Sequence, residues 1–249
     1  MNFVDSKYNS SIKGLIESIY QIIMRMTQLI IKCAPIGVFG LMTKTVSNTG
    51  LSIFKELGLY AFTIACGLSI HLFIVLPLIL LIFVKVNPIK HFQAMASAMV
   101  TAFSTSSSSA TLPVTIKCVK DNVKASNEVT SFVLPMGATI NMDGTAIMQG
   151  VATVFIANAY SIDLSLVDYL MVILTATLAS IGTAGVPGVG IIMLAMVLSQ
   201  VGLPAEGIGL IIGVDRLLDM VRTVVNVTGD STVSIIVAKS ENQLDRKSY

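Results

Sequence analysis

Charged side chains are scarce in this sequence. Asp, Glu, Lys and Arg make up 12% of its 249 residues, hydrophobic residues make up 54%, and the mean hydropathy is +0.82. A soluble domain carries roughly 25% charged residues, so this composition is typical of a membrane protein in contact with a lipid bilayer. The net charge is only +2 and no basic patch lies outside the short loops, which excludes a nucleic-acid partner.

Residues that usually carry enzyme or metal chemistry are also few. The three cysteines, Cys33, Cys66 and Cys118, cannot all pair with one another, and they lack the spacing of a metal site. The two imidazoles belong to His71 and His91, and no acid orients either of them near a serine nucleophile. The sequence therefore predicts neither an enzyme nor an organic cofactor.

Two long stretches contain no charge. The first, between Glu56 and Lys85, is long enough to cross a bilayer core of about 30 Å. The second, between Asp168 and Glu206, would measure about 55 Å as one straight helix, which is too long for a single span. Because its middle, residues 182–190, reads GTAGVPGVG, we expect two half-length helices folded back at a glycine-rich tip.

The remaining segments complete the prediction of an all-α membrane protein. Helical spans are expected at 15–46, 57–84, 129–160 and 208–238. Lysines gather around a broken segment at 89–119 and follow the last span, so both belong on the cytoplasmic side. The consistent arrangement is four transmembrane helices plus two re-entrant helical hairpins. The units 89–160 and 169–238 then form an inverted repeat, which is typical of secondary transporters.

Five polar residues of the last span share one helical face. Asp219, Arg222, Thr223, Asn226 and Asp230 are spaced three or four apart, or lie next to each other, within a narrow stripe. An isolated charge at membrane depth costs a few kcal/mol or more, so this stripe must face protein, water, ions or a substrate. The alternative is an Asp219–Arg222 pair that only holds helices together.

The two expected hairpin tips differ in chemistry. Residues 105–113, TSSSSATLP, carry hydroxyls and no large side chain, and a half-helix that begins there directs free N–H groups at an anion. Residues 182–190 are glycine-rich and can expose main-chain carbonyls. A flexible serine linker and an ordinary interhelical loop are the respective alternatives.

A third segment, GATINMDGTA at 137–146, predicts a cation site. Thr139, Asn141 and Asp143 alternate and cannot share one helical face, so we expect a locally unwound turn inside the span. Its oxygens suit a small alkali cation. A solitary Asp143 that accepts main-chain hydrogen bonds is the alternative.

The charges of these segments favour ion coupling. Four aspartates and two arginines leave a net charge of −2, to which an acidic amino acid would add a further −1. The list is Asp143, Asp215, Asp219, Asp230, Arg216 and Arg222. Moving such a site through lipid requires neutralisation by bound cations or protons.

Four of these segments resemble, in the right order, the signature segments of the dicarboxylate/amino acid:cation symporter family of glutamate and aspartate transporters. They are SSSSATLPVT, GATINMDGTA, ASIGTAGVPGVG and DMVRTVVNVTGD. The resemblance covers nearly the whole chain, including CAPIGVFGLM at 33–42. It implies an elevator-type carrier in the cell membrane, a homotrimer, and Na⁺ or H⁺ as the coupling ion.

The resemblance also implies residue roles. Arg222 would bind the side-chain carboxylate of the substrate, and Asp219 its amino group. The other implied substrate-binding residues are Ser107, Ser108, Ser109, Thr145, Ala184, Gly185, Val186, Pro187, Gly188, Thr223 and Asn226. The implied sodium ligands are Gly137, Thr139, Asn141, Met142, Asp143, Asn226 and Asp230.

Two features of the stripe bear on the substrate. An acid that binds an ammonium group, Asp219, is useless for a plain C4 dicarboxylate, and Arg222 disfavours neutral amino acids. Glutamate or aspartate is therefore favoured, with a C4-dicarboxylate or another amino acid as the alternative. Some members carry an arginine just before the serine tip, where this chain has Ser106, and Arg216 is the alternative source of that charge.

Members of the family have about four further spans before the point where this chain starts. Residues 1–50 would then be a residual scaffold helix and residues 51–249 the transport domain. A truncated, non-transporting membrane fragment of such a carrier is the remaining alternative.

Overall fold

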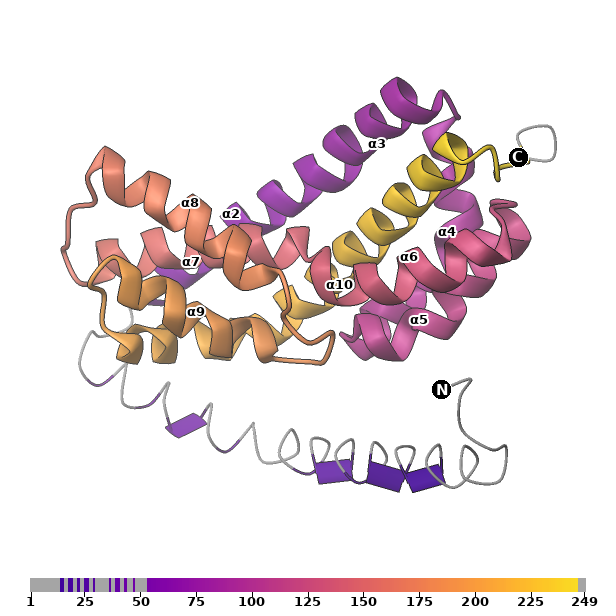
Figure 1. Cartoon of the computed structure of the whole chain (residues 1–249). Helices are drawn as coiled ribbons and strands as arrows, with labels where there is room; N and C mark the ends of the chain where they lie inside the picture. The colour runs from indigo at the N-terminus through magenta and orange to yellow at the C-terminus, as the bar shows by residue number, and fades with distance from the viewer. Residues whose placement is uncertain are drawn as a thin grey trace. The chain divides into compact units, whose positions relative to one another are not determined.

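A computed structural model describes residues 53–245 and scattered helical positions between residues 14 and 47. The chain divides into two compact units, Met1–Asn48 and Thr49–Tyr249, and every labelled helix belongs to the second (Figure 1). The predicted scaffold helix within residues 1–50 lies largely outside the described residues. In the described part the secondary structure is helical, apart from one isolated bridge between Ala125 and Leu244.

The first uncharged stretch forms one continuous helical rod. It consists of α2 (Ile53–Ile70), a π-helical turn η1 (His71–Val75), α3 (Leu76–Ile79) and a second π-helical turn η2 (Leu80–Val84). Pro77 lies at the start of α3, where it removes a main-chain donor and is flanked by the wider turns. Within the described residues, Phe54–Val84 is the one helix both long and apolar enough to cross a membrane.

The serine-rich segment is the tip between two packed helices. Asn87 caps α4 (Pro88–Thr105) by accepting a hydrogen bond from the Ile89 N–H, and Pro88 occupies the first helical position. The chain turns at Ser106, which has φ 50°. Ser107 then caps α5 (Ser108–Lys117), and the π-helical turn η3 (Cys118–Asn122) follows.

The GATINMDGTA segment interrupts a helix, as predicted. Ser126 caps α6 (Asn127–Ile140), and α7 (Asp143–Ala159) begins three residues after α6 ends. Between them Asn141 has φ −101°, ψ 80° and Met142 has φ −115°, ψ 53°, both outside the helical region. The break frees main-chain groups and turns the side chains of 141–143 towards different neighbours.

The glycine-rich segment joins two antiparallel half-length helices, as predicted. A capping box of Ser165 and Asp168 starts α8 (Leu166–Ser180), and hydrogen bonds from Ser165 hold the pKa of the exposed Asp168 carboxyl below its usual value. The tip ends at Gly188, whose φ of 79° suits glycine, and α9 (Val189–Gln200) follows.

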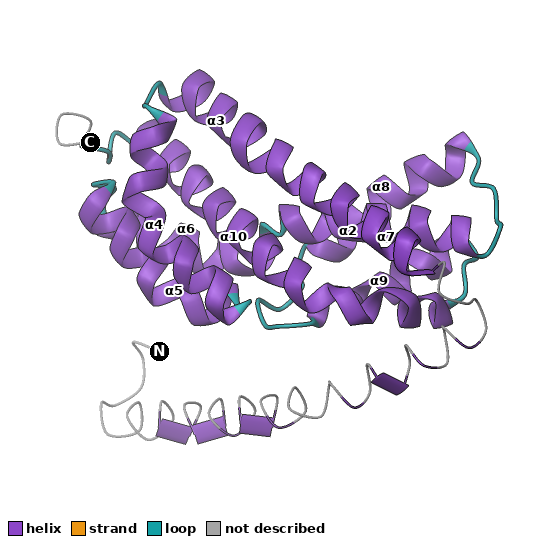
Figure 2. Ribbon diagram, turned by 180° about the vertical axis from the view of Figure 1, so that it is seen from behind, coloured by secondary structure: helices purple, strands orange, loops and turns teal. Residues whose placement is uncertain are grey.

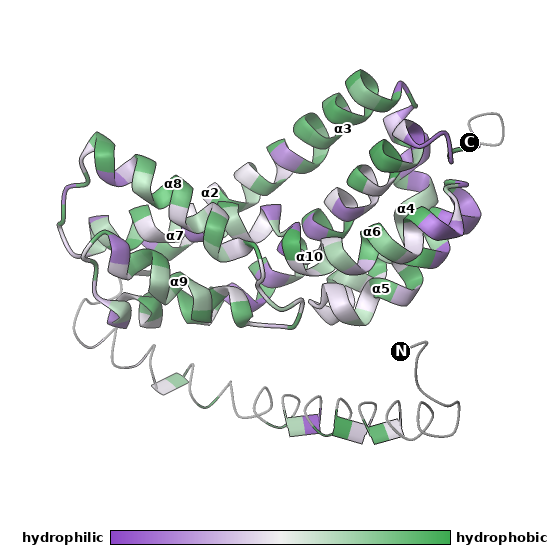
Figure 3. Ribbon diagram, in the orientation of Figure 1, coloured by the Kyte–Doolittle hydropathy of each residue, from purple (hydrophilic) through white to green (hydrophobic). Residues whose placement is uncertain are grey.

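The longest helix, α10 (Ile208–Ser240), follows the 3₁₀ turn η4 (Ala205–Gly207) and organises the unit. Helices α4–α6 lie at one end and α7–α9 at the other, while α10 and the α2–η2 rod run along both groups (Figures 1 and 2). Residues 222–232 of α10 are buried on every side, polar and apolar alike. Figure 3 shows hydrophobic residues over α3 and α8 and polar residues along α10.

The chain end after α10 returns to the start of α6. The Ser126 N–H donates to the Gln243 carbonyl at 3.0 Å, and the Asp245 N–H donates to the Lys124 carbonyl at 3.1 Å. The side chains of Ser126 and Gln243 are hydrogen-bonded as well. These hydrogen bonds join the end of α10 to the start of α6.

Close packing between η4 and α7 gives a test of the fold. A Cβ added at Gly207 would collide with the Cγ2 of Ile156, whereas one added at Gly150 on α7 would meet open space. We expect Gly207→Ala to destabilise the protein by about 1–3 kcal/mol through overpacking. Gly150→Ala should be neutral or stabilise it by up to about 1 kcal/mol, since alanine favours a helix.

Thermal unfolding of the purified variants in detergent, each against the wild type, measures both changes. Equal midpoints for Gly207→Ala and the wild type would contradict the packing described for η4.

Candidate functional site

The tips of both hairpins meet each other beside the break between α6 and α7. The carbonyl of Gly185 accepts the Ser107 hydroxyl at 2.6 Å and the Ser109 N–H at 3.1 Å. The Gly182 N–H donates to the Thr139 carbonyl at 2.8 Å. Three segments that the sequence predicts to bind ligands therefore converge on the middle of α10.

A buried ion-pair cluster lies under these tips. Arg222 is 2% exposed, and its Nη2 and Nε donate to Asp219 Oδ1 at 2.7 and 3.2 Å. Its Nη1 donates to Asp215 Oδ1 at 3.0 Å. One guanidinium therefore bonds to two buried carboxylates on its own helix, and the i,i+3 and i,i+7 spacing along α10 makes this possible.

The second hairpin closes directly over this cluster. The Gly188 N–H donates to Asp219 Oδ2 at 3.1 Å, so a main-chain donor at the start of α9 faces the carboxylate. The Arg216 side chain is about half-exposed and its Nη1 lies 4.0 Å from the same oxygen. Arg216 thus sits at the rim, where solvent screens its charge.

One turn further along α10, Asn226 connects that helix to α7. Its Oδ1 accepts the Gly144 N–H at 2.8 Å, and its Nδ2 lies 3.3 Å from Thr145 Oγ1. The same Nδ2 lies 3.5 Å from the sulfur of Met142. Asn226 therefore satisfies a donor at the free N-terminus of α7.

The third polar group is centred on Asp230. It is 3% exposed and accepts one side-chain hydrogen bond, from Asn141 Nδ2 at 2.9 Å. Gly137 approaches it closely, because a Cβ on that residue would lie 2.8 Å from Asp230 Oδ1. On the other side, Asp143 Oδ2 lies 3.1 Å from His71 Nε2 of η1.

Some of the implied cation ligands lie close together in the structure, and others do not. Asn141, Asp143 and Asp230 gather with the glycine backbone at 137 and 229, while the Gly137 carbonyl also accepts the Asn141 N–H at 2.8 Å. The Thr139 side chain is exposed and donates to the Met136 carbonyl. Within the described residues no three His, Cys, Asp or Glu side chains cluster, so amide and main-chain oxygens would have to complete a cation's shell.

A small cavity lies between the tips and α10. Its volume is about 20 Å³, which is enough for about one water molecule and far too little for an amino acid. The residues that line it are Ser106, Ser108, Met142, Thr145, Thr183, Ala184, Gly185, Val186, Gly190, Asp219, Arg222, Thr223 and Asn226. Most of the implied substrate-binding residues therefore share one small pocket.

The remaining implied residues lie around this cavity. Ser107 and Ser109 hold the opposite tip, Gly188 contacts Asp219, and Pro187 lies between Val186 and Gly188 in the second tip. The structure adds Ser106, Thr183 and Gly190 to the lining, and it places His71 against Asp143. In the sequence, His71 stands out as a lone imidazole in an otherwise uncharged span. Its partner, Asp143, lies 72 positions away, so the sequence does not reveal the pair.

Broken helices whose ends meet at buried charges are typical of secondary transporters. The family model for the sodium:dicarboxylate symporter family matches residues 1–240, and the chain belongs to this family.

Two transporters have similar sequences over most of the length of this chain. Excitatory amino acid transporter 3 of Homo sapiens is 48% identical over 225 residues, which is 90% of this chain and 43% of that protein. Excitatory amino acid transporter 1 of Ambystoma tigrinum is 44% identical over 230 residues, 91% of this chain and 42% of that protein. The chain thus spans less than half the length of these relatives.

The contact between the tips can be tested by adding one methyl group. A Cβ on Gly185 would lie 2.8 Å from Ser109 Oγ and 2.9 Å from the Ala138 carbonyl. We expect Gly185→Ala to separate the tips and to speed amide exchange roughly tenfold or more at 105–111 and 182–188, since their mutual hydrogen bonds are lost.

Hydrogen–deuterium exchange in detergent measures this difference, with Gly58→Ala on α2 as the matched control because its Cβ would meet open space. Unchanged protection of both tips in Gly185→Ala would contradict the contact.

Proposed function

We propose that this chain is the substrate-binding portion of a cation-coupled symporter of acidic amino acids, with glutamate and aspartate as substrates. The observation that carries this proposal is the fully buried Arg222, held between Asp215 and Asp219 beneath two hairpin tips. The names of the similar transporters support an acidic amino acid as the substrate.

The chemistry of binding is an exchange of partners. A guanidinium presents a planar fork that matches a carboxylate, so the substrate carboxylate replaces Asp219 on Arg222. The freed Asp219 then accepts the substrate ammonium group. Each buried charge keeps a partner of opposite sign, which is the condition for burying it at all.

A purely structural ion pair is the competing interpretation. It explains the Asp219–Arg222 contact, but not the convergence of two polar tips and a broken helix on the same residues. Replacing a buried ion pair with well-packed apolar residues is often neutral or stabilising, so stability alone is a weak reason for such a cluster. A functional role accounts for both observations.

Substrate entry requires the second tip to open. The cavity of about 20 Å³ cannot hold an amino acid, and the Gly188 N–H is bound to Asp219. Opening 181–188 breaks this hydrogen bond and the contacts of Gly185 with Ser107 and Ser109. Gly182 and Gly188, both with positive φ, are suited to absorb the change.

Cation coupling follows from the charge of the site. Asp230 is buried with one amide donor, and Asp143 lies nearby with a single imidazole partner. We propose sodium at this group, with Gly137, Thr139, Asn141, Met142 and Asn226 as further ligands. Sodium supplies positive charge that lets an anionic substrate cross the membrane, and the family's description as sodium symporters supports it over protons.

The membrane arrangement belongs to the same proposal. Four transmembrane helices, two re-entrant hairpins with their tips at mid-membrane, an inverted repeat and an elevator-type movement would place 51–249 as the transport domain in a homotrimer in the cell membrane. The apolar rod Phe54–Val84 and the helix pairs α4–α5 and α8–α9 support it.

Two alternatives remain within the family. A C4-dicarboxylate lacks the ammonium group that Asp219 would bind, so competition by succinate against labelled aspartate separates these substrates. A fragment that binds substrate without transporting it is distinguished from a working carrier by measuring binding in detergent and uptake into vesicles with the same protein preparation. Binding without uptake would support the fragment.

Removing the guanidinium tests the substrate site. Arg222→Cys should weaken glutamate and aspartate binding by about 30-fold or more, because a desolvated charge pair is lost, and should favour a neutral amino acid. Isothermal titration of purified protein with glutamate, aspartate and serine measures this change.

Lys90→Cys is the matched control, because it also removes one positive charge but from an exposed position at the start of α4. Glutamate affinity that is the same in Arg222→Cys and the wild type would refute the assignment of Arg222.

Neutralising Asp230 tests the cation site. Asp230→Asn should raise the sodium concentration for half-maximal aspartate binding about tenfold or more, since a charged ligand is lost. Asp163→Asn, in the exposed loop before α8, is the control. A sodium titration of Asp230→Asn that overlays the wild type would remove Asp230 from the cation site.

A further inference from the structure

One carboxylate oxygen of the arginine cluster is approached by two different donors. Asp219 Oδ1 accepts the Nη2 and Nε of Arg222, at 2.7 and 3.2 Å. Asp219 Oδ2 accepts the Gly188 N–H of the second tip at 3.1 Å. The Nη1 of Arg216 lies 4.0 Å from the same Oδ2, which is too far for a hydrogen bond but close enough for an ion pair. The second tip and Arg216 therefore approach the same atom.

Arg216 is placed next to Asp219 by α10 itself. The two residues are three positions apart on one helix, so they stay neighbours whatever the second tip does. The Arg216 side chain is 51% exposed, whereas the Asp219 side chain is 9% exposed. Solvent screens the present ion pair, so it is weak. A change of rotamer can bring the guanidinium about 1 Å closer to the carboxylate without moving the backbone.

The charge around Asp219 favours such a shortening once the tip moves away. Asp215 and Asp219 carry two negative charges and Arg222 carries one positive charge, so the buried cluster has an excess of one negative charge. Neither residues 100–116 nor residues 169–214 contain a lysine or an arginine, so both hairpin tips bring main-chain donors but no positive charge. A buried carboxylate oxygen that loses its donor is destabilised unless another donor replaces it.

We propose that Arg216 is a positioning residue that replaces the Gly188 N–H on Asp219 Oδ2 when the second tip opens. Opening of 181–188 is part of the proposed function, and this inference rests on it. In the closed arrangement the tip supplies the donor. In the open arrangement the guanidinium of Arg216 supplies it and also neutralises the excess negative charge. Asp219 thus keeps a partner in both arrangements, and Arg216 raises the fraction of molecules in which the tip is open.

Arg216→Met removes the charge and the donors of this side chain but keeps an unbranched side chain. We expect it to slow amide exchange at 182–188 about 3- to 10-fold, since the open form loses a hydrogen bond from a charged group. Hydrogen–deuterium exchange of the substrate-free protein, in detergent with choline chloride in place of sodium, measures this change. An ion pair that stabilised only the closed form would give the opposite result, faster exchange.

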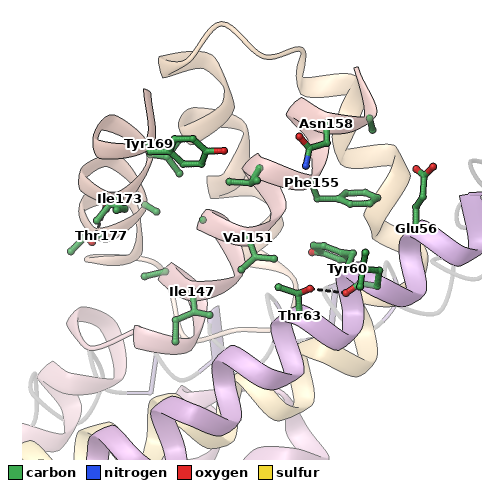
Figure 4. Close-up of a pocket in the computed structure, with 17 residues that line it drawn as sticks. Glu56, Tyr60, Thr63, Ile147, Val151, Phe155, Asn158, Tyr169, Ile173 and Thr177 are labelled. Atoms are coloured by element: carbon green, nitrogen blue, oxygen red, sulfur yellow. Dashed lines mark hydrogen bonds between the residues drawn. The ribbon is translucent and has the colours of Figure 1, made fainter. Parts of the chain in front are cut away.

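Two variants control for a general effect of charge. Lys90→Met removes a positive charge from the exposed start of α4. Glu56→Gln removes a negative charge from α2, where Glu56 lines a pocket of about 790 Å³ between α2, α7 and α8 (Figure 4). None of the described residues that line this pocket belongs to either tip. Neither variant should change the exchange at 182–188.

A double-mutant cycle with Asp219→Asn identifies the partner of Arg216. In that background Arg216→Met should leave the exchange at 182–188 nearly unchanged, because the carboxylate that Arg216 stabilises is gone. The salt dependence is a second measurement that needs no change at Asp219. A higher concentration of choline chloride should slow exchange in the wild type towards the rate of Arg216→Met and have little effect on that variant, because salt screens the half-exposed arginine.

The outcomes separate this inference from the proposed function. Unchanged or faster exchange in Arg216→Met, or an equal slowing in the Asp219→Asn background, overturns the inference, whereas the proposed function stands as long as the wild type binds aspartate. If the folded wild type binds neither glutamate nor aspartate, the proposed function fails. The exchange rates then still decide whether Arg216 stabilises the open tip, because they are measured without substrate.

Discussion

The arginine that lies between two aspartates is the constraint on which the rest of the structure depends. A guanidinium that is 2% exposed must have anionic partners, and Asp215 and Asp219 provide them from the same helix. The cluster leaves one negative charge in excess, which the main-chain donor of Gly188 and the rim residue Arg216 partly offset. In the proposed function, this near balance lets an amino acid with both charges replace one internal contact with two external ones.

The irregular backbone around this cluster supplies further partners for the buried polar side chains. Helix α10 is regular, so its polar side chains lie at fixed positions along it. The break between α6 and α7 and the two tips bring main-chain donors and acceptors to those side chains. Gly137, Gly185 and Gly229 stand where a Cβ would lie within 3 Å of an atom of the opposing segment. Close approach, more than flexibility, explains most of the glycines in the signature segments.

The elements themselves could be predicted from local signals. Uncharged runs, the proline after Asn87 and the glycines at 182–190 predict the rod, both helix pairs and their tips, and the alternation at Thr139, Asn141 and Asp143 predicts the break before α7. Family membership could also be inferred, because the four signature segments appear in order. The spacing of Asp219, Arg222 and Asp230 places them on one face and permits the Asp219–Arg222 pair. The partners from other segments, Asn141 for Asp230 and Gly188 for Asp219, are not local, and periodicity cannot supply them.

By itself, the sequence determined an all-helical chain with broken segments and a polar stripe, since helix periodicity and backbone breaks are properties of neighbouring residues. Only the tertiary structure decided that the pocket is too small for an amino acid, that Gly188 contacts Asp219 and that His71 meets Asp143. These two pairs join positions 31 and 72 residues apart, and their contacts depend on how the α2–η2 rod, α7 and α9 pack around α10. Packing of that kind depends on the shape of whole helices, which no local pattern specifies.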